Sequence, residues 1–376
     1  MMMPAMRVKM EFAPVVNDIL DQLPAEVWMS DCTTFLDPAF GGGQFLREIE
    51  RRLREAGHSQ DNISSRVYGC EIRQIRLNWT WDHGGVKTRN LIKTDFVSYD
   101  GWGDMKFDVI VGNPPYQSDK RTGTQPLWPL FVQKCHHLLK EDGHMALVIP
   151  NKWCGHTTNV IKGGIHLYSQ ILKDRMVACN IQECTRYFPG VGGYADSFSW
   201  FMINNSGSSQ FITTTQDGTY TVNSEWFTYL PLRCVTKTTS SILSKLNTGK
   251  SYQFKQVSTG FKNTDNGSVV ISMAQRLHYD KLNIYWDKSS GVTPTSKSTV
   301  SQVTFSKSSQ KKVQAVFRSK LFKFIHHIYW NNDNFGTTFY NSLPYVDLNK
   351  MWDDKSLYDL FKLSSEEVEY IEHHVA

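Results

Sequence analysis

Four consecutive residues, Asn113, Pro114, Pro115 and Tyr116, directly follow a short apolar run, FDVIVG (107–112), which is typical of a buried strand. Proline has a fixed φ and no N–H group, so this segment can neither extend a strand ladder nor begin a helix interior. The Pro114 carbonyl oxygen and the Asn113 amide oxygen can therefore converge on one point. Two convergent acceptors suit a planar amino group, and they favour sp³ character at its nitrogen, which makes the nitrogen more nucleophilic. Tyr116 offers a flat face for the ring that carries the amine.

Polar or glycine residues also follow three earlier strand-like runs. The first run ends at a triple-glycine loop, Gly41 to Gly43, which lets a ligand approach the backbone at a helix N-terminus. Glu71 ends the second run and suits a ribose diol, and Asp95 ends the third run and can accept from an exocyclic amine. Asp37 stands at the mouth of the glycine loop, where a carboxylate would repel a pyrophosphate but suits a cation. S-Adenosylmethionine, which has a ribose, an adenine, an ammonium group and a sulfonium, matches these residues.

Five strand-like runs alternate with amphipathic segments over the first 205 residues, which predicts an α/β domain with a doubly wound, largely parallel sheet. The runs are 33–40, 65–72, 90–96, 107–112 and 144–150, with helices expected at 44–57 and 126–143. The composition then becomes rich in Ser, Thr and aromatic residues, with a hairpin expected around Asp217 and Gly218 and a capped helix expected after Ser364 or Ser365. We expect three parts: a catalytic domain at 1–205, a basic domain at 206–345 and a helical tail at 346–376.

Composition excludes several protein classes. Hydrophobic residues make up 40% of the 376 residues, and no apolar run approaches the roughly 20 residues that a membrane-spanning helix needs. The N-terminal segment MMMPAMRVKM lacks the apolar core of a signal peptide, so we expect a cytoplasmic protein in a bacterial host, whether encoded by the bacterium or by a phage. The 7 cysteines are scattered without a C-x-x-C pair and the 12 histidines show no ligand spacing, so we expect single buried thiols and no metal.

Positive charge is concentrated in the second half of the chain. Residues 205–345 contain 16 Lys and Arg against 6 Asp and Glu, a net charge of +10 in a chain whose total is +5. A polyanion would therefore be bound mainly by this region. The predicted DNA contacts, interleaved with aromatic residues, are Lys255, Lys262, Arg276, Lys307, Lys311, Lys312, Arg318 and Lys320.

Two of these motifs carry a family resemblance. The segment DPAFGGGQF (37–45) resembles the cofactor-binding motif, and NPPY (113–116) the catalytic motif, of S-adenosylmethionine-dependent DNA N6-adenine methyltransferases. The motif order is similar to the gamma arrangement, and in particular to Eco57I-like modification methylases. The resemblance implies a Rossmann-like class I methyltransferase sheet followed by a mixed α+β target recognition domain. It also implies double-stranded DNA as the partner, base flipping of the target adenine, and restriction-modification as the setting. Whether the chain protects DNA against a separate restriction endonuclease or acts alone stays open.

The resemblance also assigns site residues. Glu71 would bind the ribose hydroxyls, Asp95 and Phe96 the cofactor adenine, and residues 12–20 would lie near the methionine moiety. Phe188, in a segment similar to a later family motif, would stack on the flipped adenine opposite Tyr116. The predicted catalytic residues are Asn113, Pro114, Pro115 and Tyr116; the predicted cofactor-binding residues are Asp37, Pro38, Ala39, Gly41, Gly43, Phe45, Glu71, Ile72, Asp95 and Phe96. Phe40 departs from the family pattern, since a small residue is usual before the glycines.

Two alternatives stay open. The same NPPY loop occurs in enzymes that methylate a release-factor glutamine and in certain ribosomal RNA methyltransferases, which usually carry their extra domain before the cofactor motif. Here only about 30 residues precede that motif and about 170 basic, aromatic-rich residues follow the core, which favours DNA. A chain that binds DNA without catalysis, as a specificity subunit, is the other alternative, and the intact motifs argue against it.

Overall fold

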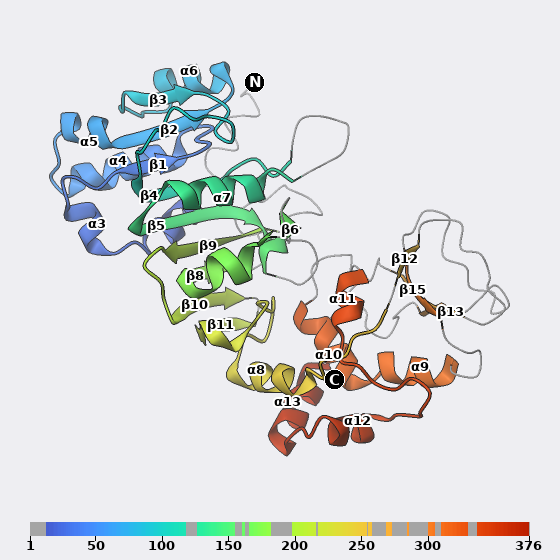
Figure 1. The fold of residues 1–376 in the computed structure, drawn as a ribbon. Coiled ribbons are helices and arrows are strands. Elements are labelled where there is room, and N and C mark those ends of the chain that lie inside the picture. Colours follow the sequence, from blue (N-terminus) through green and yellow to red (C-terminus); the bar gives the residue numbers. More distant parts are fainter. Residues whose placement is uncertain are drawn as a thin grey trace, which may run out of the picture. The chain divides into compact units, whose positions relative to one another are not determined.

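The computed structural model describes residues 13–117, 126–154, 160–161, 165–181, 198–215, 217–253, 255–257, 268–272, 284–285, 300–304, 310–329 and 337–375. These residues divide into two compact units (Figure 1). The first unit lies within Met1–Trp153 and Asn159–Glu225, and the second lies within Cys154–Thr158 and Trp226–Ala376.

A nine-stranded sheet organises the first unit, in the order β11-β10-β8-β9-β5-β4-β1-β2-β3. Its strands are β1 (Phe35–Asp37), β2 (Val67–Glu71), β3 (Asn90–Lys93), β4 (Phe107–Gly112), β5 (Leu139–Pro150), β8 (Met176–Asn180), β9 (Phe198–Asn204), β10 (Gln210–Thr215) and β11 (Gly218–Asn223). The pairs from β3 to β5 are all parallel. The order β3-β2-β1-β4-β5 is that of a Rossmann-like sheet, with its switch point between β1 and β4. All five predicted strands are present, which confirms the predicted α/β sheet.

An antiparallel strand continues the sheet beyond β5. β9 pairs antiparallel with both β5 and β8, so β8 again runs parallel to the first five strands. β10 pairs parallel with β8, and β11 pairs antiparallel with β10 as the second strand of a hairpin. The predicted hairpin is therefore confirmed. Because β10 joins the large sheet, the compact unit extends to Glu225, twenty residues past the expected boundary near 205.

The helices of the first unit are α2 (Ala13–Leu20), α3 (Ala25–Met29), α4 (Gln44–Glu55), α5 (Gln60–Arg66), α6 (Gln74–His83) and α7 (Trp128–Leu138). α4 buries Phe45, Leu46, Ile49 and Leu53, which recur at helical spacing. These side chains share one core with Val15 and Ile19 of α2 and with apolar residues of β1 and β4. The predicted helix at 44–57 is thus confirmed. The helix predicted at 126–143 ends earlier, because β5 already begins at Leu139.

The second unit contains helices α8 (Lys237–Leu246), α9 (Gln310–Phe317), α10 (Lys320–Tyr329), α11 (Thr337–Ser342), α12 (Asp354–Leu360) and α13 (Ser365–Val375). A four-stranded antiparallel sheet accompanies them, in the order β12 (Lys255–Val257), β15 (Val300–Thr304), β13 (Ser268–Ser272), β14 (Ile284–Tyr285). The predicted mixed α+β composition is confirmed. A two-stranded pair, β6 (Val160–Ile161) and β7 (Ile165–His166), completes the described strands.

The predicted tail packs into the core of the second unit. Leu357, Phe361 and Ile371 share one buried cluster with Phe322 and Phe324 of α10. Ser364 caps α13, because its Oγ accepts from the Glu367 N–H at 3.2 Å while the Glu367 carboxylate accepts from the Ser364 N–H at 2.7 Å. The cap predicted at Ser364 or Ser365 is therefore at Ser364. No helix in the described part of the chain is long and apolar enough to span a membrane.

Candidate active site

The NPPY segment leaves the sheet at the end of β4, next to the end of β1. Asn113 and Tyr116 are partly exposed, Pro114 is buried and Pro115 is exposed. The Leu127 N–H donates to the Tyr116 carbonyl at 3.0 Å, which ties the far end of the loop to the start of α7. The predicted catalytic residues therefore stand at the switch point of the sheet, where a doubly wound fold binds its ligands.

Tyr116 contacts Asn113 and Phe198. Its hydroxyl donates to Asn113 Oδ1 at 2.7 Å. Its ring stacks on Phe198, with centroids 4.6 Å apart and an interplanar angle of 25°. Phe198 opens β9 and is paired with Pro150 in the ladder. Sequence reasoning did not single out Phe198, although it lies in the segment 186–203 in which an aromatic partner was sought; Phe188 itself lies outside the described residues.

Asp37 ends β1 beneath the glycine loop. Its side chain is only 1% exposed, and its Oδ1 accepts from the Ala39 N–H at 3.0 Å. Burial, together with a smaller contribution from the negative charge of Glu71, raises the pKa of this carboxyl to about 8, although the hydrogen bond from the Ala39 N–H lowers it in part. The carboxylate is thus buried below the loop and is not exposed at its mouth. Such an environment favours a neighbouring cation.

Glu71 ties the glycine loop to the end of β2. Its carboxylate accepts from the Gly41 N–H at 3.1 Å and from the Arg73 N–H at 2.8 Å, and Arg76 lies 4.0 Å away. Gly43 has a φ of +73°, and a Cβ atom there would lie 2.6 Å from Thr80 Cγ2. The loop can therefore close on α4 only with glycine at this position.

Phe40, the departure from the family pattern, does not line this loop. Its side chain is buried in the core of the first unit, and a Cβ atom on Gly69 would lie 2.7 Å from Phe40 Cδ1. Its N–H donates to the Cys70 carbonyl at 3.0 Å. The larger side chain is accommodated because β2 has a glycine opposite it.

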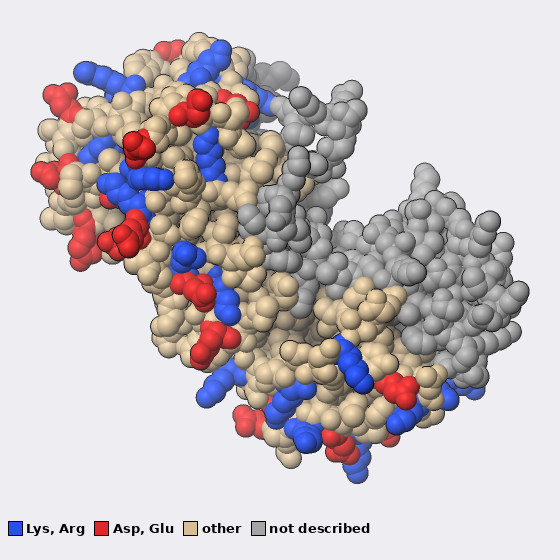
Figure 2. All heavy atoms as spheres, in the orientation of Figure 1, with Lys and Arg blue, Asp and Glu red and all other residues tan. Residues whose placement is uncertain are grey.

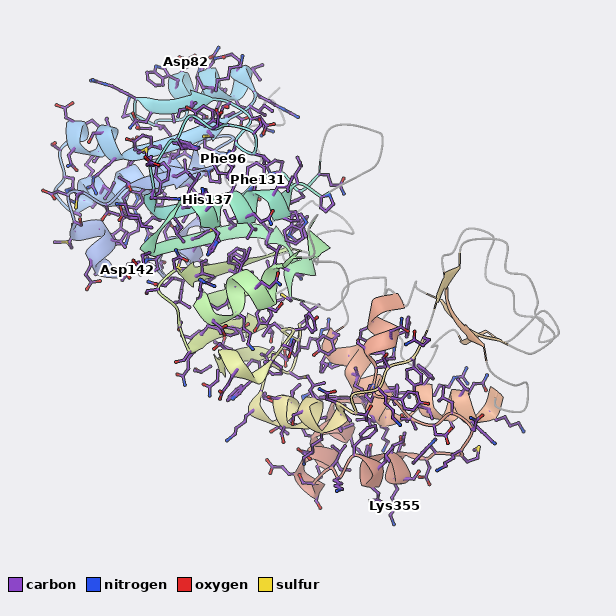
Figure 3. The ribbon with its side chains drawn as sticks, viewed as in Figure 1. Asp82, Phe96, Phe131, His137, Asp142 and Lys355 are labelled. Carbon is purple, nitrogen blue, oxygen red and sulfur yellow. The ribbon has the colours of Figure 1, made fainter. Side chains whose placement is uncertain are left out.

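Asp95 and Phe96 follow β3 and have different environments. Asp95 is exposed, and its carboxylate accepts from the Val97 N–H at 3.1 Å, as in an Asx turn. Phe96 is buried and stacks on Phe131 of α7, with centroids 5.3 Å apart (Figure 3). Ile72, at the end of β2, is 60% exposed. Asp95 and Ile72 are therefore accessible to a ligand, whereas Phe96 has a packing role.

The predicted DNA contacts whose side chains are described fall into two groups. Lys312 Nζ donates to the Asn349 carbonyl at 2.7 Å, and Lys320 Nζ lies 2.9 Å from the Glu372 carboxylate. Lys311 and Arg318 are exposed. Only the backbone of Lys255 is described, in β12, and Lys262, Arg276 and Lys307 lie outside the described residues. Figure 2 shows Lys and Arg interspersed with Asp and Glu over the described surface in that view.

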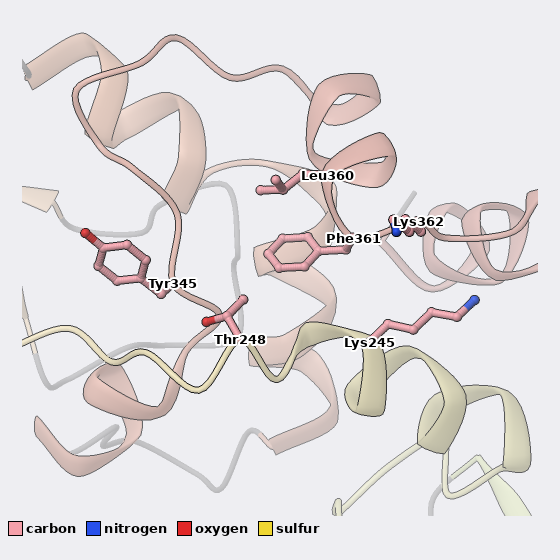
Figure 4. Close-up of a pocket in the computed structure, with 6 residues that line it drawn as sticks. All are labelled: Lys245, Thr248, Tyr345, Leu360, Phe361 and Lys362. Atoms are coloured by element: carbon pink, nitrogen blue, oxygen red, sulfur yellow. The ribbon is translucent and has the colours of Figure 1, made fainter.

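A cavity of 420 Å³ lies within the second unit (Figure 4). Its lining is Lys245, Thr248, Tyr345, Leu360, Phe361 and Lys362. Lys245 is already paired with Glu367 at 2.6 Å, and Lys250 Nζ lies 5.7 Å from the centre of the Tyr345 ring. None of the residues assigned to chemistry lines it. Among the described residues, no group of three or more His, Cys, Asp or Glu side chains is arranged to hold a metal ion.

Comparisons with known proteins match part of this chain. Residues 50–162 match the family model described as Eco57I restriction-modification methylase, which confirms the predicted resemblance. The chain is 32% identical over 132 residues to the modification methylase CviBIII of Paramecium bursaria Chlorella virus NC1A, covering 31% of each protein. It is 33% identical over 104 residues to an uncharacterized adenine-specific methylase of Mycoplasma pneumoniae, covering 26% of this chain and 21% of that protein. The matches span less than a third of these relatives.

A solved structure is also similar. The modification subunit of a putative type I restriction enzyme from Vibrio vulnificus YJ016 aligns with a TM-score of 0.41 and 21% identity. The alignment covers 54% of this chain and 46% of that chain.

Proposed function

We propose that this chain transfers a methyl group from S-adenosylmethionine to the N6 amino group of an adenine in double-stranded DNA, at a specific site. The observation that carries the proposal is the position of Asn113 and Pro114 at the end of β4, beside the end of β1 and its glycine loop. A nucleophile held at the first position and a cofactor held at the second would meet at the switch point of the sheet. The matches to modification methylases, one of them named adenine-specific, support the same reaction.

The residues at this edge fit the proposed cofactor. Asp37 and Glu71 place two carboxyl groups near one glycine loop, and the charge of Glu71 raises the electrostatic cost of ionising Asp37. A cationic ligand relieves that cost, whereas the phosphates of a dinucleotide would increase it. Glu71 would hold the ribose hydroxyls, Asp95 the adenine amine, and Ile72 the adenine face. When bound, S-adenosylmethionine supplies a methyl group on a positively charged sulfur.

The NPPY loop then binds and polarises the target amine. The two N–H groups of the amine would donate to Asn113 Oδ1 and to the Pro114 carbonyl oxygen. These hydrogen bonds direct the nitrogen lone pair towards the methyl donor. The nitrogen attacks first and loses its proton afterwards, so no side chain is assigned as a general base. Because a duplex hides this amine, the base must be extruded at a cost of a few kcal/mol, and stacking on Tyr116 offsets part of that cost.

Nucleoside mass spectrometry tests the proposal. DNA and RNA are isolated from methylation-deficient cells that express either the chain or its Asn113→Ala variant. We expect new N6-methyladenine in DNA with the wild type, and a loss of activity of about two to three orders of magnitude in the variant, as when one preorganised polar group is removed from a transition state.

Three other outcomes separate the alternatives. Methylated nucleosides in RNA alone, or a methylated glutamine in a release factor, would replace DNA as the substrate. DNA binding without any methyl transfer, together with no S-adenosylmethionine binding in calorimetry, would indicate a specificity subunit.

A further inference from the structure

The side chain of Tyr116 is held at its hydroxyl and at one face of its ring. The hydroxyl at the tip donates to Asn113 Oδ1 at 2.7 Å, and one ring face lies on Phe198 with centroids 4.6 Å apart. Phe198 is itself held by the ladder between β9 and β5, which places it opposite Pro150. The two residues are 82 positions apart in the sequence, so the contact depends on the assembled sheet and not on a local turn.

We propose that Phe198 is a positioning residue for base capture, which backs the Tyr116 ring so that the target adenine meets a preformed stacking surface. The inference rests on the proposed function. An aromatic side chain that is already ordered loses little rotamer entropy when a base stacks on it, so more of the stacking energy remains for extrusion.

The Asn113 contact gives this arrangement a second function. The Tyr116 hydroxyl gives the acceptor oxygen of Asn113 a hydrogen-bond donor. An amide oxygen has two lone pairs, so the amine can bind there while the Tyr116 ring keeps its place. Phe198 thus acts on the amine only through Tyr116 and does not touch the reacting atoms.

Phe198→Leu and Phe198→Trp form the decisive pair of variants. Sequencing of methylated DNA first gives the target site, and a duplex with 2-aminopurine at the target position reports base extrusion by fluorescence. We expect Phe198→Leu to raise the Kd for this duplex about threefold to tenfold, the range of one aromatic pair. Methyl transfer at saturating DNA should change less than twofold, and Phe198→Trp, which can still stack, should restore the wild-type Kd.

A second readout needs no DNA. Nitration of Tyr116 by tetranitromethane, located by peptide mass spectrometry, should be faster in Phe198→Leu than in the wild type, because the ring loses its cover. Trp79→Leu, which removes a stacked pair with His83 on α6 in the same unit, serves as the matched control and should change neither readout.

The two readouts separate failure of this inference from failure of the proposed function. If the wild type methylates DNA but Phe198→Leu leaves the Kd and the nitration rate unchanged, Phe198 does not position Tyr116. A fall in transfer rate at saturating DNA without a change in Kd would also overturn the inference. If the wild type transfers no methyl to DNA, the proposed function fails, and the nitration experiment alone decides whether Phe198 holds Tyr116.

Discussion

A Cβ atom added to Gly112 would lie 2.8 Å from Asp37 Oδ1 and 3.0 Å from Pro38 Cδ. Gly112 is the last residue of β4 and directly precedes Asn113, whereas Asp37 is the last residue of β1. The proposed catalytic loop and the proposed cofactor loop are therefore in contact through a position that has no room for a side chain. A displacement of either loop is transmitted to the other.

Gly112→Ala should disturb both loops. Overpacking of this kind costs about 1–3 kcal/mol of stability, and here the displaced group is the buried Asp37 carboxylate. We expect a weaker affinity for S-adenosylmethionine in calorimetry and a lower rate of methyl transfer. Gly143→Ala is the matched control, because its Cβ would meet Leu139 at 2.9 Å within β5. Gly143→Ala should lower the melting temperature but leave cofactor affinity unchanged. Equal cofactor affinities for the wild type and Gly112→Ala would refute the coupling between the two loops.

The raised pKa of Asp37 predicts a dependence of stability on pH. The folded protein binds a proton at Asp37 with a pKa of about 8, against 3.8 in the unfolded chain. The stabilisation from this group is complete below the lower value and is lost as the pH rises through the higher one. The free energy of unfolding of the wild type, relative to Asp37→Asn, should therefore fall between about pH 4 and pH 8 and stay level above.

The comparison with Asp37→Asn is necessary because other groups titrate in the same range. Burial lowers the pKa of His136, His144 and His326. These groups make the free energy of unfolding rise with pH over part of the same range. Urea unfolding of both proteins at several pH values isolates the Asp37 contribution, since these histidines are common to both. Parallel curves for the two proteins would show that the Asp37 carboxyl titrates normally.

The sequence predicts the strand ends better than the partners of the strands. Short apolar runs that end in Asp37, Glu71 and Asn113 mark buried parallel strands, because buried strands read as continuous apolar segments and their ends need turn or ligand residues. β10 and β11 are rich in threonine and lack the continuous apolar run that marks a strand of a buried sheet. Their pairing with β8 depends on contacts distant in sequence, which periodicity does not encode.

The site shows the same division between local and distant information. Asn113 and Tyr116 are three residues apart, so their proximity follows from the motif, and their hydrogen bond is local. The stacking of Tyr116 on Phe198 and the contact of Gly112 with Asp37 join separate strands, and neither was predicted. The burial of Asp37 was missed for a related reason: a charged residue after a strand is usually solvated.

Glu71→Gln should weaken cofactor binding, because it removes an acceptor for the backbone of the glycine loop and an acceptor for the ribose hydroxyls. The carboxylate accepts backbone N–H donors from Gly41 and Arg73, and it retains acceptor capacity for ribose hydroxyls. A glutamine can offer one oxygen only, so its amide NH₂ would face a backbone N–H group. Hydrogen bonds to a charged group contribute about 1.5–3 kcal/mol, so calorimetry should give a Kd for S-adenosylmethionine raised by at least about tenfold. An unchanged Kd would remove Glu71 from the cofactor site.

Lys311 and Arg318 should contact DNA phosphates, because both are exposed and neither shows an ion pair among the described residues. Each phosphate contact contributes about 0.9 to the slope of log K against log salt concentration. We expect Lys311→Ala and Arg318→Ala each to lower that slope by about 0.9 and to weaken binding equally to specific and non-specific duplexes.

Lys320→Ala is the control. Its ion pair with Glu372 predicts a small loss of thermal stability and an unchanged slope. If Lys320→Ala lowered the slope and the other two did not, DNA would displace Glu372 from Lys320, and the DNA-contacting surface would have to be reassigned to the face of α10 that meets α13.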